Sequence, residues 1–363
     1  MKQITKFTLL IGVLILVGFS EVFACTIFRL RAKDGSMMVT RSMEFGVDLR
    51  YDIIVVPRNK KYASPFATGT NGLKWSTIYG YAGVASFGLD HGLSDGMNEK
   101  GLAVGVLWYE TDMKWQEVTT SDSSVALAQS VFCDWVLGSF ATVDELRNAV
   151  AGVKVFNYVD PPTGMAPTCH FIVYDATGGC IVIEYEHGEC HIYDNPLGIM
   201  TNAPSFPWHL TNLRQYIGLE TVNPQTVNAA GMTFRPTGHG DGMFGLPGDY
   251  TPPSRFVRLG MFMHTVDQQP DAIKNLNLCN HVINSFTIPF GIIYDISPDG
   301  KPVNKESTQW VTFRDQTNSI LYFKTYENPT LRKIDLKQLD FSAREVKRIP
   351  MYGSQETIVD CVK

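Results

Sequence analysis

The sequence lacks the motifs by which several common enzyme classes are detected. It has no CxxC pair, so a zinc ribbon or a thioredoxin-like redox site has no support. It has neither a P-loop ending in GKS or GKT nor a strand-linked GxGxxG, the signatures of phosphate and dinucleotide sites. His239 and Asp241 could both bind a metal, but two ligands on a glycine-rich loop are weak evidence. We therefore expect no cofactor and no metal.

The chain also lacks a strong excess of charge. Its 31 basic and 36 acidic residues give a formal net charge of −5, and they are scattered along the sequence. This balance supplies no basic surface for nucleic acid or for an anionic membrane, so we expect neither partner. After residue 24 no apolar run is long enough to cross a bilayer, and stable membrane insertion of the mature chain is not expected.

The first 24 residues have the pattern of a signal peptide. Lys2 and Lys6 precede the uncharged apolar run 9–19, which is shorter than the roughly 20 residues of a spanning helix. Val22 and Ala24 are small residues three and one positions before the expected cut. We predict a signal peptide over residues 1–24, a mature chain of one domain over 25–363, and a periplasmic or secreted location.

Seven cysteines are present, and export would place them in an oxidising compartment where disulfides can form. The odd number leaves at least one cysteine unpaired or otherwise used. Cys180 and Cys190 flank a plausible hairpin and are one candidate pair, although the sequence leaves the disulfide pattern open.

Strand-like and helix-like segments occur in clusters rather than in regular alternation. The turn Lys33–Ser36 predicts a hairpin between residues 26–30 and 37–40. Thr142 and Glu145 form a capping box that predicts the start of a helix. Clustered strands, then helices, then strands again favour a layered α+β fold. Further strands are expected at 53–56, 102–108, 170–174, 180–185, 310–313 and 320–326, and further helices at 123–137, 208–217, 253–263 and 270–285.

Three interpretations compete for Cys25, the first residue after the predicted signal. It could be half of a structural disulfide, the usual role of an exported cysteine. It could carry the lipid of a bacterial lipoprotein, although Val22 and Phe23 fit that signal poorly. It could be an N-terminal nucleophile, because a cut after Ala24 gives one residue both a thiol and a free α-amine. With a reference pKa of about 7.7–8, that amine can act as the general base.

Arg41 and Glu44, at the end of the predicted hairpin, favour the third interpretation. If the hairpin folds back, Arg41 lies near Cys25, and a guanidinium there favours the thiolate over the thiol. Glu44 could accept a hydrogen bond from the α-ammonium or hold Arg41 in place. The alternative is an ordinary surface ion pair, worth at most about 1 kcal/mol.

The order of several short motifs now resembles a known family, the choloylglycine hydrolases, which include bile salt hydrolases and penicillin V acylases. Each motif is weak alone, but five in the correct order over almost the whole mature chain are specific. The matching segments are Cys25-Thr26 with Thr40-Arg41-Ser42-Met43-Glu44, Asn98-Glu99-Lys100-Gly101-Leu102, Thr201-Asn202-Ala203-Pro204, Leu246-Pro247-Gly248-Asp249, and Pro253-Ser254-Arg255-Phe256.

The resemblance implies a four-layer αββα sandwich of the N-terminal nucleophile hydrolase type. It implies that Cys25 is the nucleophile, that its α-amine is the base, and that Arg41 lies beside the thiol. It also implies that Asn202 donates its side-chain amide to the oxyanion, as an amide N–H can, and that Arg255 supports the nucleophile. Without the other motifs, Asn202 would be read as a turn residue before Pro204.

Two residues depart from the family pattern. Glu44 stands where the family often has aspartate, so the carboxylate reaches one methylene further. Trp108 stands where bile salt hydrolases of Gram-positive gut bacteria often have asparagine and penicillin V acylases often have an aromatic residue. We expect the Trp108 backbone N–H to complete the oxyanion hole, although the side chain could simply be core packing.

The expected reaction is hydrolysis of a linear amide bond in a small amphipathic substrate. Met43, Phe45 and Phe66 are candidate walls of an apolar acyl pocket, because they lie on segments near the nucleophile. The first expectation is a glycine- or taurine-conjugated bile salt, and the alternatives are penicillin V and a long-chain N-acyl homoserine lactone. The non-enzymatic alternative is a lipoprotein binding module anchored at Cys25. By the same resemblance, residues 218–245 predict a homo-oligomer, a tetramer or a dimer.

Overall fold

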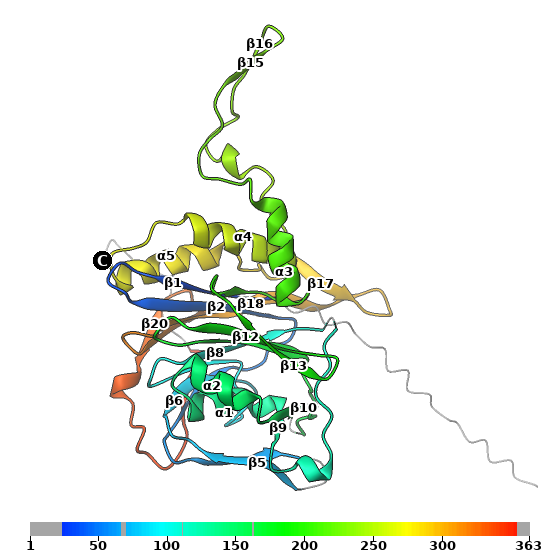
Figure 1. The fold of residues 1–363 in the computed structure, drawn as a ribbon, viewed down its shortest axis with the longest axis vertical. Helices are drawn as coiled ribbons and strands as arrows, with labels where there is room; N and C mark the ends of the chain where they lie inside the picture. The colour runs from blue at the N-terminus through cyan, green and yellow to red at the C-terminus, as the bar shows by residue number, and fades with distance from the viewer. Residues whose placement is uncertain (1–23, 67–69, 111, 162, 354–363) are drawn as a thin grey trace, which may run out of the picture.

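The computed structural model describes residues 24–66, 70–110, 112–161 and 163–353. Of the predicted signal peptide only Ala24 falls within these residues, and Cys361 lies outside them. In the described part of the chain two large sheets, one of seven strands and one of eight, lie face to face. Helices cover the outer face of each sheet (Figure 1).

The first sheet begins with the predicted hairpin and is completed by strands from the C-terminal third of the chain. Its order is β14-β1-β2-β18-β19-β20, and β17 pairs with β18. All nine residues of β2 are buried, because the second sheet lies on one side of this strand and helices lie on the other. The strands are β1 (Cys25–Arg31), β2 (Met37–Phe45), β14 (Ile199–Met200), β17 (Ile293–Ile296), β18 (Pro302–Asp315), β19 (Ile320–Thr325) and β20 (Arg332–Asp335).

The second sheet is an antiparallel arrangement in the order β13-β12-β11-β8-β7-β6-β3-β21. Its inner strands are rich in valine and isoleucine, as expected where both faces are covered. The strands are β3 (Asp52–Val56), β6 (Tyr81–Ala85), β7 (Asp95–Asn98), β8 (Ala103–Trp108), β11 (Cys169–Tyr174), β12 (Cys180–Glu186), β13 (Glu189–Asp194) and β21 (Lys347–Pro350).

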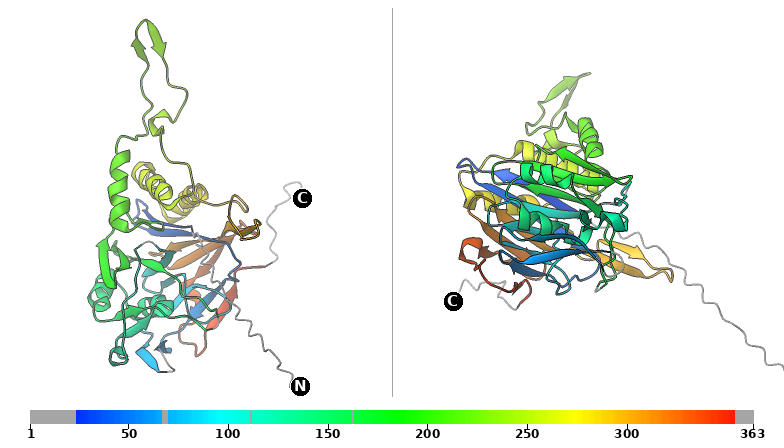
Figure 2. Two further views of the ribbon diagram at one scale, coloured as in Figure 1. Left: turned by 90° about the vertical axis from the view of Figure 1, so that its right-hand side faces the viewer. Right: turned by 60° about the horizontal axis from the view of Figure 1, so that its bottom comes forward.

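Two layers of helices complete a four-layer αββα sandwich, which confirms the predicted fold class. The first sheet is covered by α3 (Phe206–Leu213), α4 (Pro252–Thr265) and α5 (Ala272–Asn284), and the second by α1 (Phe132–Ser139) and α2 (Val143–Val150) (Figures 1 and 2). The Thr142 side chain caps α2 by accepting a bond from the Glu145 N–H, as predicted. Prolines in the first turn start α4, because their missing N–H groups need no partner there.

The two sheets approach closely at β1. Ile27 of β1 and Ile172 of β11 belong to one apolar core between the sheets. At Gly105 of β8 a Cβ atom would lie 2.8 Å from Ile27 Cδ1, so only glycine fits without a shift. This close contact fixes the start of β1 against the second sheet.

Some local expectations were wrong. The helix expected over 123–137 begins only at Phe132, because Ala126–Ala128 forms a strand (β9) that pairs in parallel with Lys154–Phe156 (β10). Two further strands, Lys61–Pro65 (β4) and Asn71–Ser76 (β5), form a separate hairpin.

Cys180 and Cys190 are not bridged, and all six cysteines within the described residues are free. Cys190 pairs with Tyr185 across the β12–β13 hairpin. Cys180 is five residues before Tyr185 in β12. At the rise of a strand it is therefore roughly 17 Å from the position that pairs with Cys190, which is too far for a disulfide.

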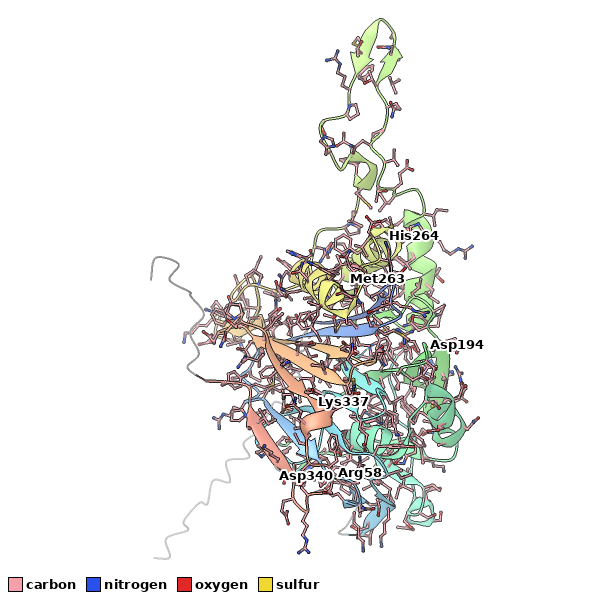
Figure 3. All side chains as sticks on the ribbon, turned by 90° about the vertical axis from the view of Figure 1, so that its left-hand side faces the viewer. Arg58, Asp194, Met263, His264, Lys337 and Asp340 are labelled. Atoms are coloured by element: carbon pink, nitrogen blue, oxygen red, sulfur yellow. The ribbon has the colours of Figure 1, made fainter. Side chains whose placement is uncertain are left out.

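Residues 218–245 form an arm that projects from the helical layer and ends in the hairpin β15 (Val227–Ala229) and β16 (Met232–Phe234) (Figures 1 and 2). In Figure 3 the side chains of the arm stand apart from the body, whose α4 carries the labelled Met263 and His264. No helix in the described ranges is both long enough and apolar enough to cross a membrane.

Candidate active site

Cys25 opens β1 and pairs with Met43 of β2 across the hairpin. Only 3% of the residue is exposed. Its Sγ lies 3.5 Å from Arg41 Nη2 and 3.8 Å from Met43 Sδ. The fold therefore brings Arg41 beside the thiol, as the hairpin predicts.

Arg41 is fully buried and held from several sides. Its guanidinium donates hydrogen bonds to the carbonyl oxygens of Ser94 and Val106 on the second sheet. It lies 3.9 Å from Asp95 Oδ1 and over the ring of Trp310 at 5.2 Å. Burial alone lowers the pKa of Arg41, but Cys25 and Asp95 outweigh burial, so that the pKa is raised and the cation is retained.

Asp95 of β7 serves two buried arginines. Besides Arg41 it forms an ion pair with Arg314, and it accepts a hydrogen bond of 2.7 Å from Thr312 Oγ1. Burial raises the pKa of Asp95, whereas Arg314 and Arg41 lower it. One carboxylate and two guanidinium groups have a net charge of plus one, and the Arg41 guanidinium of this group faces the sulfur of Cys25. Asp95 was not predicted from the sequence, because it stands among other polar residues in the short strand β7 and both of its arginine partners lie far away in sequence.

Asn202 follows β14 and joins several parts of the site. Its Oδ1 accepts hydrogen bonds from the Cys25 backbone N at 2.8 Å and from Arg255 Nη2 at 2.7 Å. Its Nδ2 donates to the Trp108 carbonyl at 3.0 Å. The Asn202 amide oxygen thus faces the Cys25 nitrogen. The Asn202 amide nitrogen, which was expected to donate to an oxyanion, donates one of its N–H groups to the Trp108 carbonyl.

Two buried histidines fix the backbone on either side of Asn202. His170 lies 3.0 Å from both Glu184 Oε1 and the Thr201 carbonyl oxygen. His209 Nε2 donates to the Asn202 carbonyl at 2.8 Å, and burial lowers the pKa of His209 to about 4. His209 is therefore neutral near pH 7. Neither histidine was singled out in the sequence, because both contacts depend on segments that meet only in the fold.

Arg255 lies in the first turn of α4, and its side chain reaches Cys25 and Thr26 at the start of β1. It is fully buried, and it donates to the Cys25 carbonyl and to Thr26 Oγ1, the latter at 2.8 Å. Its Nε donates to the Tyr250 carbonyl at 2.9 Å, which fixes the side chain from behind. Arg255 therefore holds the backbone of Cys25 and the side chain of Asn202 together.

Glu44 lies on the opposite face of β2 from Arg41, as the alternation of a strand requires. Its Oε1 accepts a hydrogen bond of 2.7 Å from Thr308 Oγ1, and its backbone N–H donates to the Ala24 carbonyl at 3.1 Å. Burial raises the pKa of Glu44 to about 7, and Arg255 opposes the rise. Glu44 therefore lies beside the Ala24–Cys25 bond but does not hold Arg41, a role that Asp95 takes.

An apolar cleft opens at Cys25, and the space that it outlines, open solvent included, is about 950 Å³. Met43, Phe45 and Trp108 line it. Met43 and Phe45 were expected in the cleft, whereas Trp108 was expected to contribute its backbone N–H or to pack in the core. Phe66 does not line the cleft: it packs edge-on against Phe156, 5.5 Å away, in the core beneath α1. The remaining apolar lining is Leu49, Tyr51, Phe87, Leu89, Leu93, Val106, Met165 and Pro167.

Polar side chains occupy one part of the cleft. His91 Nε2 lies 3.6 Å from Asp160 Oδ1, and both residues line the cavity. An apolar cleft with a few polar groups and a thiol at its end suits a largely apolar acyl group. The Cys25 thiol lies beside the Arg41 cation and close to the Cys25 backbone nitrogen. This combination suits acyl transfer through a covalent intermediate.

The chain is similar in sequence and fold to proteins of known family. A sequence model described as linear amide C–N hydrolases, choloylglycine hydrolase family, matches residues 25–349. A bile salt hydrolase/transferase of Clostridium perfringens is 29% identical over 328 residues, covering 89% of this chain and 95% of that protein. A penicillin V acylase of Pectobacterium atrosepticum is 26% identical over 94% of this chain and 89% of its own length. A crystal structure of a mutant conjugated bile acid hydrolase from C. perfringens superposes with a TM-score of 0.79 at 27% identity, covering 93% of this chain and all of that one.

Proposed function

Because the chain belongs to the choloylglycine hydrolase family of linear amide C–N hydrolases, we propose that it deconjugates glycine- or taurine-linked bile salts with Cys25 as the nucleophile. One observation carries the proposal. The Cys25 thiol lies at the end of an apolar cleft, 3.5 Å from a buried guanidinium. That geometry suits attack on the amide carbonyl of a bulky apolar acyl group.

The proposed cycle begins with export to the periplasm or the exterior and removal of residues 1–24, which leaves Cys25 with a free α-amine. The amine takes the thiol proton, and the sulfur attacks the carbonyl carbon. The Trp108 N–H and the Asn202 amide stabilise the oxyanion. The C–N bond then breaks as the α-ammonium gives its proton to the leaving amine. Water, activated by the same α-amine, hydrolyses the thioester and releases the acid.

The lining of the cleft and the relatives' printed names support this substrate class. A steroid acid presents a large apolar surface with few hydroxyl groups, and the cleft presents apolar walls with a few polar groups, His91 and Asp160 among them. Two of the proteins compared are described as acting on bile salts or conjugated bile acids.

Penicillin V or a long-chain N-acyl homoserine lactone is the second candidate substrate. The observation that favours it is the aromatic Trp108 in the cleft wall, together with the similarity to a penicillin V acylase. The lipoprotein alternative is less well supported. A lipid anchor has to reach the membrane, whereas Cys25 is 3% exposed and enclosed between two sheets.

The proposal is tested by following amine release from glycocholate, taurocholate, penicillin V and a long-chain acyl homoserine lactone. The enzyme is the mature chain beginning at Cys25, and Cys25→Ala is the control. We expect the bile conjugates to react fastest and Cys25→Ala to be inactive. Turnover of only penicillin V or the lactone would keep the mechanism and replace the substrate, and no turnover at all would reject the proposal. An intact mass shows whether Cys25 is free or carries lipid.

We propose that the arm over 218–245 binds a second copy of the chain, so that the protein is a dimer or tetramer. Its 28 residues carry only three charges. Ile217 at its base is 87% exposed and Phe244 is 88% exposed. Apolar side chains so exposed on a projecting segment are typical of a contact surface.

Excision of the arm is expected to convert the oligomer to a monomer without unfolding the body. The chain can be closed at the base of the arm, because the Glu220 N–H donates to the Gly242 carbonyl at 3.0 Å. We suggest replacing residues 222–240 by a glycine–serine pair and measuring mass by light scattering. Phe234→Ser, which removes one 51% exposed side chain from the hairpin, should weaken assembly less. An unchanged oligomeric mass after excision would contradict the proposal.

A further inference from the structure

A second buried carboxyl group lies beside Glu44. In the β2–β18 register Glu44 pairs with Thr308, and Glu306 is two residues before Thr308 on the same face of β18. That position is the diagonal neighbour of Glu44, within reach of a long side chain. Glu44 is 1% exposed and Glu306 is 3% exposed. The two buried carboxyl groups are therefore neighbours on one face of the first sheet.

This carboxyl pair has fewer hydrogen bonds and less counter-charge than two buried carboxylates need. Within the described residues, Oε2 of Glu44 and Oε2 of Glu306 are buried and accept no hydrogen bond. The charged groups that act on the pair are Arg255 of α4, Asp295 of β17 and, from the far side of β2, Arg41. Arg41 is already paired with Asp95. Arg255 is therefore the remaining cation for two buried carboxyl groups, which are costly to ionise unpaired.

The Glu44–Glu306 pair, with its excess of negative charge, lies next to the Ala24–Cys25 bond, which removal of the signal peptide would cut. The Glu44 N–H donates to the Ala24 carbonyl, and Arg255 donates to the Cys25 carbonyl. Removal of Ala24 puts an α-amine at this place, and its ammonium form would supply one positive charge. The two negative charges of the carboxylates would then be matched by two positive charges, those of Arg255 and the ammonium. The uncut chain has no α-ammonium at this place and cannot reach that balance.

We propose that Glu306 is a positioning residue for the reaction: with Glu44 it forms a buried carboxyl pair that receives and orients the α-ammonium of mature Cys25. The inference rests on the proposed function of Cys25. Burial raises the pKa of Glu306 to about 8, with Glu44 adding to the rise and Arg255 opposing it. In the uncut chain the pair therefore keeps one proton near pH 7.

The proton count follows from the cut. Water hydrolyses the Ala24–Cys25 amide, and Ala24 leaves as a carboxylate while Cys25 retains an ammonium group. The carboxyl pair then loses its proton to solvent, and both carboxylates face two cations. During catalysis the α-amine alternates between its neutral and charged forms, and Glu306 acts through that amine without touching the substrate.

The test compares mature protein carrying Glu306→Gln with wild type, with Glu306→Asp and with a matched surface variant, Glu189→Gln, whose side chain is exposed. The first readout is the pH profile of kcat/KM. The second is the pH dependence of Cys25 alkylation by iodoacetamide, followed by intact mass, which needs no substrate. A thermal melt identifies any variant that does not fold.

We expect Glu306→Gln to lower the apparent pKa of the Cys25 α-amine by about 1 unit in both pH profiles. The reason is that the variant loses a nearby negative charge that favours the ammonium form. Glu306→Asp should restore most of the shift, and Glu189→Gln should superimpose on wild type. Superimposable alkylation profiles for wild type and Glu306→Gln would overturn the inference. If Glu306→Gln does not fold, Glu306→Met, which removes the carboxylate but keeps a side chain of similar length, is measured in its place, and profiles superimposable on wild type would overturn the inference in the same way. Failure of the substrate panel alone would reject the proposed substrate but leave the alkylation result to decide the role of Glu306.

Discussion

Replacement of Asp95 with asparagine is expected to lower the free energy of unfolding by about 3–5 kcal/mol, because it leaves two buried guanidinium groups without their shared counter-charge. Asp95 pairs with both Arg41 and Arg314, and all three side chains are fully buried. The loss should exceed that of an ordinary surface pair, which is worth at most about 1 kcal/mol. Asp95→Asn should also reduce turnover, because Arg41 would lose one of the contacts that hold it beside Cys25.

The measurement is denaturant unfolding of mature Asp95→Asn alongside a matched control. Asp194→Asn is suitable, because the Asp194 side chain (labelled in Figure 3) is 80% exposed, forms a surface ion pair with Arg147 and does not line the cleft. We expect less than about 1 kcal/mol from the control. A loss below 1 kcal/mol for Asp95→Asn would contradict the assignment of Asp95 as the shared counter-charge.

Residues close in sequence to Cys25 were the easiest part of the site to place. Arg41 could be predicted beside the thiol because a short turn fixes the β1–β2 register, and a register fixes which side chains share a face. Asn202 and Arg255 lie far away in sequence, and only their resemblance to family motifs indicated that they reach Cys25. The structure brings all four side chains together.

Other contacts had no local signal in the sequence. Glu306 and Arg314 reach the site because β18 pairs with β2, more than 260 residues earlier in the chain, and no spacing rule predicts such a pairing. Phe66 was placed in the cleft from its nearness in sequence, but β4 and β5 carry it to the opposite core. The four layers could be predicted from the family resemblance, whereas these long-range pairings could not.

Replacement of Asn202 with alanine is expected to reduce kcat by about 10²–10³-fold with a smaller change in KM, the loss typical of one oxyanion donor. The side chain makes three contacts at the site, to the Cys25 nitrogen, to Arg255 and to the Trp108 carbonyl. Alanine removes all three, so this variant alone cannot separate oxyanion stabilisation from placement of the α-amine.

Asn202→Asp separates the two roles. Aspartate keeps an oxygen to accept from the Cys25 amine and from Arg255, but it has no N–H to donate to an oxyanion or to Trp108. If oxyanion donation dominates, Asn202→Asp should be as inactive as Asn202→Ala. If placement of the amine dominates, Asn202→Asp should keep most of the activity that alanine loses. Asn71→Ala, an exposed position on β5, serves as the control and should retain wild-type kcat. Near wild-type kcat in both Asn202 variants would remove Asn202 from the mechanism and leave oxyanion stabilisation to the Trp108 backbone.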